Sequence, residues 1–308
     1  MRSPATEDLR THFDRFGFVH LPGVLGPSEV DHLRALLKKQ FAHPADRALM
    51  PRHCFQIPEV YTIPLKERIV EALDEILGKG WWFIPDLEVH RNILPQTSWH
   101  EDCGNEGPQP YLMDPDYRFV KCGLYLQDNT REWGGGVCVI PGGHKFPVRT
   151  PFLFLDFKIK NLLQRKLGRL WRERLVPLKA GDFLAFDSRL PHCSTWAQAL
   201  KEPEYGPGDI VLNMPEDKTK LVVYWNVCRR GEDALHYLHN AEKRVYADEL
   251  ERPENREWFF LDFLRYRFPE DYPPSFAKSI EEHGIHLACL PEERTAFWKR
   301  IWAERNLT

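Results

Sequence analysis

The chain has 308 residues, of which 43% are hydrophobic and 28% charged, a balance typical of a globular protein that can bury a sizeable core. Its 42 basic and 45 acidic residues leave a net charge of −3, so the overall charge does not favour nucleic acid or an anionic membrane as a partner. Seven scattered cysteines without a CxxC pair argue against disulfides and structural zinc, and they favour a cytoplasmic setting.

The first 45 residues predict a helix, a strand and a second helix. No apolar leader is visible, and no apolar run in the chain approaches the roughly 18 residues of a membrane span. Leu9, Phe13 and Phe16 recur at helical spacing, and the apolar run 18–21 ends at a Pro-Gly turn. A capping box at Ser28 predicts the start of the second helix.

Between about residues 80 and 230, short apolar runs alternate with Gly, Pro, Asn and Asp turns, a pattern that indicates a β-sandwich or barrel. The clearest runs are Leu87–Ile93, Val120–Leu126, Val137–Ile140, Phe183–Phe186 and Leu221–Val227. Residues 156–174 predict an amphipathic helix within this region. We expect one domain, 1–308, with an N-terminal helical region (1–45), a β core (80–230) and a C-terminal helical extension (232–308).

The segment Trp99-His100-Glu101-Asp102 carries the clearest chemistry. In an extended chain His100 and Asp102 point to the same side, because side chains alternate with a period of two. Two imidazoles and one carboxylate on one face of an octahedron leave the opposite face open, as in non-haem Fe(II) oxygenases. His192 is the best candidate for the third ligand, since it follows the strand-like run 183–186.

Each of these residues also has a simpler interpretation. A lone HxD pair is more often a surface histidine beside an acidic turn, and a lone His192 is more often a half-buried histidine with ordinary hydrogen bonds. The order of the three residues, their separation and the strand context together favour a metal site.

At this point the sequence resembles a known family, the phytanoyl-CoA hydroxylase-like iron(II)/2-oxoglutarate dioxygenases, from about residue 8 to residue 228. The segments that carry the resemblance are FDRFGFV (13–19), WHED (99–102), GLYLQD (123–128), GGGVCVIPGGHK (134–145) and GDFLAFDSRLPHCST (181–195). The resemblance implies a mainly β protein with flanking helices around a double-stranded β-helix (jelly-roll, cupin-like) core. It also implies Fe(II), 2-oxoglutarate and O2 as cofactor and co-substrates, and it makes His144 part of a structural turn.

The resemblance further implies an Arg that binds the far carboxylate of 2-oxoglutarate, some ten residues beyond the distal histidine. Here residues 197–216 look like an insertion, and Lys218 stands at the matching position. Lys220 has the same strand parity and is an alternative, while Arg189 and Arg229 are less well placed. Both lysines also fit a solvated strand end.

Two further residues are candidates for co-substrate contacts. Ser194 matches a family position that hydrogen-bonds the same carboxylate, and Asn92 lies on the strand before the HxD pair. Relatives that halogenate generally replace the ligating carboxylate, so Asp102 favours hydroxylation or a related oxidation. We expect the substrate to be a small-molecule metabolite or an acyl or natural-product intermediate.

An anionic substrate would fit the basic residues of segment 156–179, although these also suit the polar face of a helix. Two other functions stay open at this stage. One is a catalytically silent jelly-roll binding protein, and the other is a non-oxidative metalloenzyme that holds a different metal on the same fold.

Overall fold

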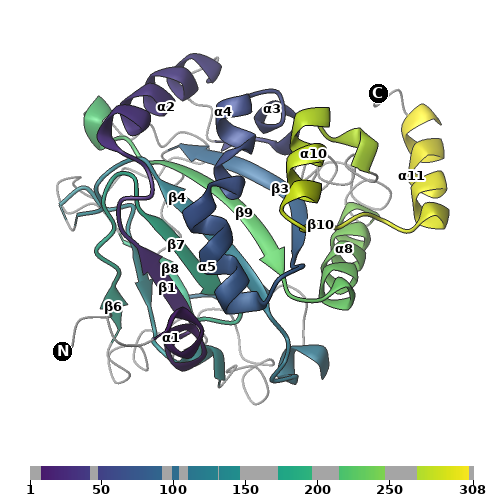
Figure 1. The fold of residues 1–308 in the computed structure, drawn as a ribbon, viewed down its shortest axis with the longest axis horizontal. Helices are drawn as coiled ribbons and strands as arrows, with labels where there is room; N and C mark the ends of the chain where they lie inside the picture. The colour runs from purple at the N-terminus through teal and green to yellow at the C-terminus, as the bar shows by residue number, and fades with distance from the viewer. Residues whose placement is uncertain are drawn as a thin grey trace, which may run out of the picture.

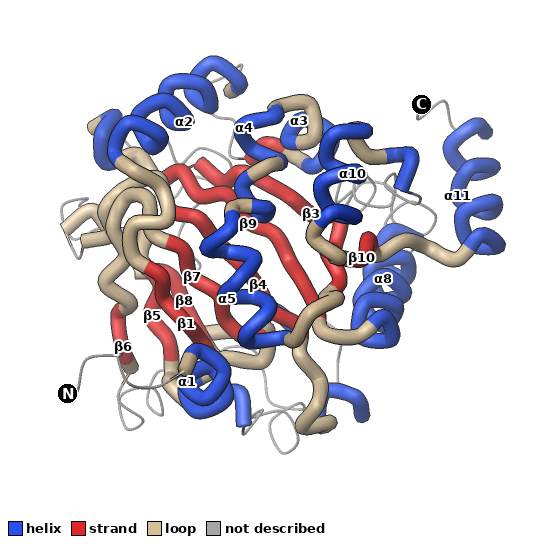
Figure 2. Tube along the Cα trace, in the orientation of Figure 1, coloured by secondary structure: helices blue, strands red, loops and turns tan. Residues whose placement is uncertain are grey.

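Two β-sheets and a layer of helices make up the fold (Figures 1 and 2). The computed structural model describes residues 8–41, 48–91, 99–103, 110–130, 132–145, 173–195, 215–246 and 269–304. The large sheet contains β1 (Phe18–Leu21), β2 (Ala48–Leu49), β3 (Trp82–Arg91), β4 (Phe119–Tyr125), β7 (Phe183–Asp187), β9 (Leu221–Cys228) and β10 (His286–Leu287). The small sheet contains β5 (Val137–Val139), β6 (Arg174–Leu175) and β8 (His192–Ser194).

The order of the strands is that of a jelly roll. The large sheet runs β1-β7-β4-β9-β3-β10, with β2 beside β3, and the small sheet runs β6-β5-β8. Around His100 the chain forms an isolated antiparallel bridge with His192 of β8, so this segment extends the small sheet. From β3 onward the chain therefore crosses repeatedly between the sheets, and neighbours in the order β7-β4-β9-β3 are antiparallel. The jelly-roll core predicted from the sequence is confirmed.

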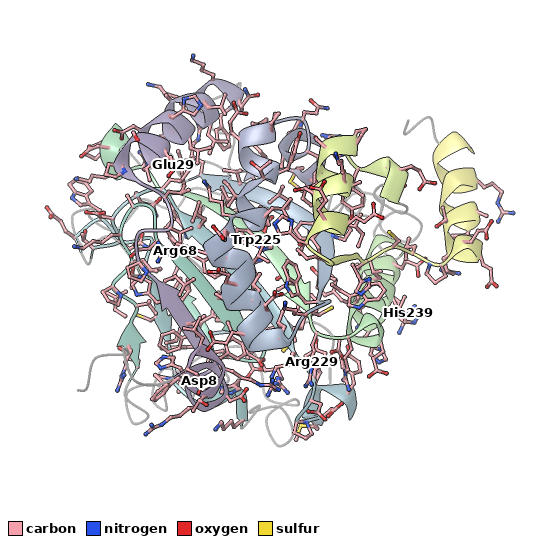
Figure 3. The ribbon with its side chains drawn as sticks, viewed as in Figure 1. Asp8, Glu29, Arg68, Trp225, Arg229 and His239 are labelled. Carbon is pink, nitrogen blue, oxygen red and sulfur yellow. The ribbon has the colours of Figure 1, made fainter. Side chains whose placement is uncertain are left out.

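Helices cover the outer face of the large sheet. They are α1 (Leu9–Phe16), α2 (Pro27–Gln40), α3 (Pro51–Cys54), α4 (Pro58–Tyr61), α5 (Glu67–Leu77) and α10 (Pro274–Glu282). Helix α5 lies across the strands (Figure 1), and Ile69 and Leu73 pack in one core with Val89 and Trp225. Trp225 lies in the middle of the molecule (Figure 3) and is fully buried.

Strand periodicity separates the two faces of the large sheet. On β9, Val223 and Trp225 belong to the outer core, whereas Val222 and Tyr224 belong to a second core between the sheets. The inner face near the opposite end of the strands is covered by α8 (Gly231–Tyr246), to which α11 (Glu292–Glu304) is joined by a salt bridge. None of the helices that the structure describes is long and apolar enough to cross a membrane.

The N-terminal prediction of helix, strand and helix corresponds to α1, β1 and α2, with one shift. Helix α2 begins at Pro27 instead of Ser28, because proline suits the first helical position and Glu29 accepts a hydrogen bond from the N–H of Gly26 at 2.9 Å. The expected helix 156–174 lies almost wholly outside the described residues, and its last residue begins β6 instead. All but the last two residues of the expected insertion 197–216 also lie outside them.

Candidate metal centre

A cavity of about 170 Å³ lies between the two sheets. His90, Lys121 and Tyr224 line it from the large sheet, whereas His192 and Ser194 line it from the small sheet. These side chains meet because the inner faces of β3, β4 and β9 lie opposite β8 across the jelly roll. The cavity is therefore the place where the sequence-predicted ligands can be tested against geometry.

The structure brings the three predicted ligands together at this cavity. One ligand atom from each of His100, Asp102 and His192 lies within 4.8 Å of the others, the one such group of three found among the described residues. The Oδ1 atom of Asp102 is 3.6 Å from Nε2 of His192 and 3.9 Å from Nε2 of His100. These distances are too long for hydrogen bonds, but two ligands about 2.1 Å from one ion lie at most about 4.2 Å apart. The donor set and the two distances from Asp102 are compatible with a single metal ion.

The main chain fixes the positions of the two histidines. The N–H of His100 donates to the carbonyl of His192 at 3.0 Å, and the N–H of His192 donates back at 2.9 Å. The ring of Phe186 packs against the imidazole of His192, with centroids 4.7 Å apart. The imidazoles are thus held by the sheet and by packing.

The protonation of His192 suits a metal ligand. Its Nδ1 lies 2.9 Å from the carbonyl oxygen of Leu190, which can only accept, so Nδ1 carries the hydrogen and Nε2 presents its lone pair to the cavity. Burial lowers the pKa of His192 to about 4, so the imidazole is neutral at neutral pH. A neutral imidazole is the form that binds metal ions.

Asp102 is the strongest sign that a cation belongs here. Burial alone would raise its pKa, but the neighbouring His192, Lys121 and His100 lower it below the ordinary value, so the carboxylate is ionised. Its Oδ2 atom is buried and has no hydrogen-bond partner. A buried, unpartnered carboxylate oxygen is costly unless a cation binds it.

The residues predicted to bind 2-oxoglutarate differ in whether they line the cavity. Ser194 lines the cavity, two residues after His192 on the same side of β8. Lys218 does not line it: it ends the 3₁₀ turn Glu216–Lys218, its side chain is 41% exposed, and its Nζ pairs with Asp217 at 2.8 Å. Of these two candidate lysines, Lys220 is the one that lines the cavity, and it is only 9% exposed. Asn92 lies outside the described residues.

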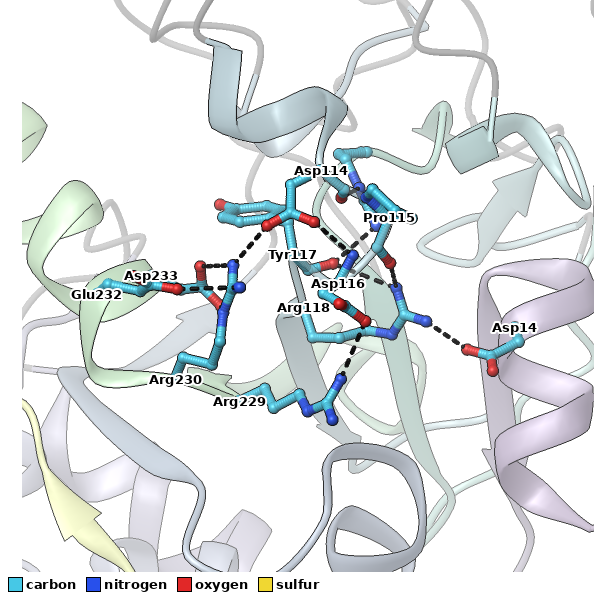
Figure 4. A network of polar contacts seen from close by, with 11 residues as sticks. Asp14, Asp114, Pro115, Asp116, Tyr117, Arg118, Arg229, Arg230, Glu232 and Asp233 are labelled. Carbon is cyan, nitrogen blue, oxygen red and sulfur yellow. Dashed lines mark hydrogen bonds and ion pairs between the residues drawn. The ribbon is translucent and has the colours of Figure 1, made fainter.

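The two arginine alternatives are held elsewhere. Arg189 donates two hydrogen bonds to the buried Asp187 carboxylate, from Nε at 2.8 Å and from Nη2 at 2.7 Å. Arg229 lies in a surface network (Figure 4), 3.5 Å from Asp116. His144 is buried in a 3₁₀ turn against Gly17 and is not in the metal-binding group. None of the three lines this cavity.

Sequence reasoning missed a group of charged residues on the large-sheet side of the cavity. The Glu88 carboxylate lies 2.7 Å from Nε2 of His90 and 3.5 Å from Nζ of Lys121. The ammonium of Lys121 also lies 5.2 Å from the centroid of the Tyr224 ring. Polar residues at alternate strand positions usually indicate a solvent-facing side, but here the second sheet covers that side.

A jelly roll with two imidazoles and a carboxylate at an internal cavity corresponds to the class of mononuclear non-haem iron oxygenases. The model of the phytanoyl-CoA dioxygenase (PhyH) family matches residues 13–196, more than half of the chain, and the chain belongs to this family. The protein is therefore an oxidoreductase that depends on Fe(II), 2-oxoglutarate and O2.

Solved structures share the fold of this chain. The chain is similar to SnoN, a non-heme alpha ketoglutarate dependent epimerase from nogalamycin biosynthesis, with a TM-score of 0.51, 20% identity, and 71% of this chain and 79% of that chain covered. It is also similar to EctD from S. alaskensis with bound Fe (TM-score 0.50, 18% identity, 70% and 74% covered). HygX from Streptomyces hygroscopicus, with nickel and 2-oxoglutarate bound, gives a TM-score of 0.50 at 18% identity, with 70% and 84% covered. No curated protein matches the sequence significantly.

Proposed function

We propose that His100, Asp102 and His192 hold the ferrous ion, and that the enzyme hydroxylates a small molecule bound in the adjoining cavity. The observation that carries this proposal is the convergence of three ligand atoms, within 4.8 Å of one another, at the cavity wall. When bound, iron with 2-oxoglutarate supplies the oxidising chemistry, in which O2 is activated as the keto acid is converted to succinate and CO2. The retained Asp102 carboxylate favours hydroxylation over halogenation.

Lys220 and Ser194 are the residues that we assign to the far carboxylate of 2-oxoglutarate. Both line the cavity, and Lys220 directly precedes β9, near the position where the family resemblance implies an arginine. The stem of Lys220 lies close to Gly135, where an added Cβ would be 3.4 Å from its Cδ. A lysine binds a carboxylate as a point charge, without the bidentate geometry of a guanidinium. Ser194 supplies a directional hydroxyl beside it.

The remaining cavity residues position the reactants and exclude water. Val137 and Phe186 are buried apolar side chains in the wall, and the fully buried Tyr125 also lines the cavity. Apolar side chains that keep water out strengthen the electrostatic contacts of the polar groups beside them. The structure of SnoN in complex with Fe3+, alpha ketoglutarate and nogalamycin RO supports a small molecule as the substrate. The seven cysteines are scattered along the sequence without a CxxC pair, a pattern that supports a cytoplasmic enzyme.

An anaerobic titration tests this proposal. Fe(II) and then 2-oxoglutarate are added to the metal-free protein while the weak visible charge-transfer band of the Fe(II)–2-oxoglutarate complex is followed. We expect the band in the wild type but not in His192→Ala. The control is His283→Ala, which changes an exposed histidine directly after α10 and should keep the band.

The outcomes separate the alternatives. Iron binding without the band, and without succinate formation under air, would instead indicate a silent binding protein. A band of wild-type intensity in His192→Ala would contradict the ligand assignment. Turnover that needs a metal but no oxygen would indicate non-oxidative chemistry.

A further inference from the structure

A second lysine, Lys121, faces the same cavity and has no role in the reaction so far. It lies on β4, on the inner face of the large sheet, and lines the cavity together with His90 and Tyr224. Burial alone would lower its pKa, but the neighbouring carboxylates, Glu88 above all, raise the pKa above its ordinary value. The side chain is therefore a fixed positive charge beside the candidate metal centre.

The surroundings of Lys121 hold it in one orientation. Glu88 contacts it through Oε1 at 3.5 Å, while the other oxygen of this carboxylate is 2.7 Å from His90. The face of Tyr224 flanks the ammonium at 5.2 Å, a cation–π arrangement. Gly123 leaves room for this ring, because a Cβ there would lie 2.9 Å from Cε1 of Tyr224. The ammonium is thus preorganised and does not need to be ordered by a ligand.

The hydrogen bonding of Lys121 is incomplete. An ammonium group has three donors, and among the described residues the only hydrogen-bond partner of Nζ is the Glu88 carboxylate, at the long distance of 3.5 Å. A buried ammonium with unused donors is costly unless another acceptor reaches it. Because the side chain borders the cavity, that acceptor can come from a bound molecule.

Lys121 lies far along the sheet from the proposed 2-oxoglutarate anchor. In the antiparallel register of β4 and β9, Lys121 is opposite Asn226, whereas Tyr125 is opposite Val222. Lys220 directly precedes β9, on the side of Val222 that is away from Asn226. Asn226 is six residues further along, so about 20 Å of extended chain separates the main chains of Lys220 and Asn226. A 2-oxoglutarate molecule anchored at Lys220 leaves Lys121 available for a different ligand.

We propose that Lys121, oriented by Glu88 and Tyr224, binds an anionic group of the primary substrate. This inference rests on the proposed function, and it narrows the substrate class to small molecules that bear a carboxylate or a phosphate monoester. Lys121 acts as a specificity-determining residue: it selects and orients the substrate in the cavity and takes no part in the chemical step.

The test uses the anaerobic holoenzyme with Fe(II) and saturating 2-oxoglutarate. The iron then fills the metal site, and 2-oxoglutarate fills its proposed site at Lys220. Calorimetric titrations with acetate, methyl phosphate and neutral acetamide probe the remaining site. We expect saturable 1:1 binding of one anion and no binding of acetamide. Whichever of acetate and methyl phosphate binds more tightly shows whether the substrate group is a carboxylate or a phosphate. In Lys121→Met, binding of this anion should be at least about tenfold weaker, while 2-oxoglutarate affinity stays within about twofold. Lys278→Met, at an exposed position of α10, makes the same charge change and should leave both unaltered.

Lys121→Met leaves Glu88 with one fewer partner, so the double variant Lys121→Met/Glu88→Gln is measured beside it to avoid an uncompensated buried carboxylate. Anion binding of wild-type strength in either variant would overturn the inference, as would a wild type that binds 2-oxoglutarate but neither anion. An equal loss of 2-oxoglutarate and anion binding would assign Lys121 to 2-oxoglutarate instead. A wild type that does not bind 2-oxoglutarate at all overturns the proposed function, and this inference with it.

Discussion

His100 and His192 exchange two backbone hydrogen bonds, of 3.0 and 2.9 Å, although several strands separate them along the chain. Their rings lie 4.2 Å apart, at an angle of 52°. The hydrogen bonds belong to the pairing of the small sheet and do not depend on an ion. The candidate metal centre is consequently preformed, and removing a ligand should affect metal affinity more than folding.

Asp102→Ala tests this separation. The variant should bind Fe(II) at least about 10- to 100-fold more weakly, because removing even a residue that only hydrogen-bonds to a metal ligand has an effect of this size. It should also lose succinate formation. The metal-free protein should change in stability by less than about 1 kcal/mol, or 2–4 °C in Tm, because Oδ2 of Asp102 makes no hydrogen bond there. Iron titration and thermal melting of the metal-free protein measure the two effects. Tight iron binding by this variant would exclude Asp102 as a ligand.

Lys220→Met and Lys218→Met form a matched pair for the co-substrate anchor. Lys220 lines the cavity, so its replacement should raise the Kd for 2-oxoglutarate by at least about tenfold, the usual effect of losing a charge-assisted hydrogen bond. Lys218 pairs with Asp217 at the surface, and its replacement should leave the Kd unchanged. Intensity of the charge-transfer band against 2-oxoglutarate concentration gives both values. The opposite ranking would restore Lys218 as the anchor.

Gly123→Ala tests the close packing of the inner face. The new Cβ would lie 2.9 Å from Cε1 of Tyr224 and 3.3 Å from Cε2 of Tyr125, so both rings must move. We expect a loss of about 1–3 kcal/mol in the free energy of unfolding. In Gly26→Ala the nearest atom is 3.7 Å away, at Glu29, and the control should change much less. Urea unfolding of both variants measures the difference, and equal stabilities would show that the rings adjust freely.

Asp86 gives a prediction for the pH dependence of stability. Burial raises its pKa to about 7, whereas an unfolded aspartate titrates near 3.8. The folded state thus holds the proton more tightly, and the free energy of unfolding falls as the pH rises from about 4 to about 7. Each pH unit in this window contributes up to about 1.4 kcal/mol.

Asp86→Asn removes this titration. The stability advantage of the wild type over the variant should shrink by on the order of 2 kcal/mol between pH 5 and pH 7.5, as measured by urea unfolding of the metal-free protein. Asp86 also accepts hydrogen bonds from the N–H and the side-chain amide of Asn226, so the variant starts less stable at pH 5. A difference that does not vary with pH would show that Asp86 ionises normally.

The sequence was sufficient for the parts of the site that follow from strand parity and order. His100 and Asp102 could be paired because side chains alternate along an extended segment, and His192 because it follows a buried strand. The same parity could not decide between Lys218 and Lys220, since both point the same way along a continuous strand. The 3₁₀ turn that ends at Lys218 decides it, and a turn of this kind has no strong sequence signal.

The charged residues on the large-sheet side were missed for a different reason. Glu88 and His90 alternate with Leu87 and Val89, a pattern that equally describes a strand with one face in water. Only the position of the small sheet over this face buries them, and that depends on contacts between segments far apart in the chain. Lys121 contributes to the same group from another strand, so no local window contains the cluster.

The short strand β1 has a role that concerns solubility. It pairs with β7 over Phe18–Leu21 and forms one border of the large sheet, so the backbone groups on that side of β7 are already paired. A strand border whose backbone groups have no partner is a template for pairing with another chain. Removal of the first 21 residues would uncover the apolar β7, and a shortened protein should then self-associate or precipitate on expression even though its metal ligands are intact.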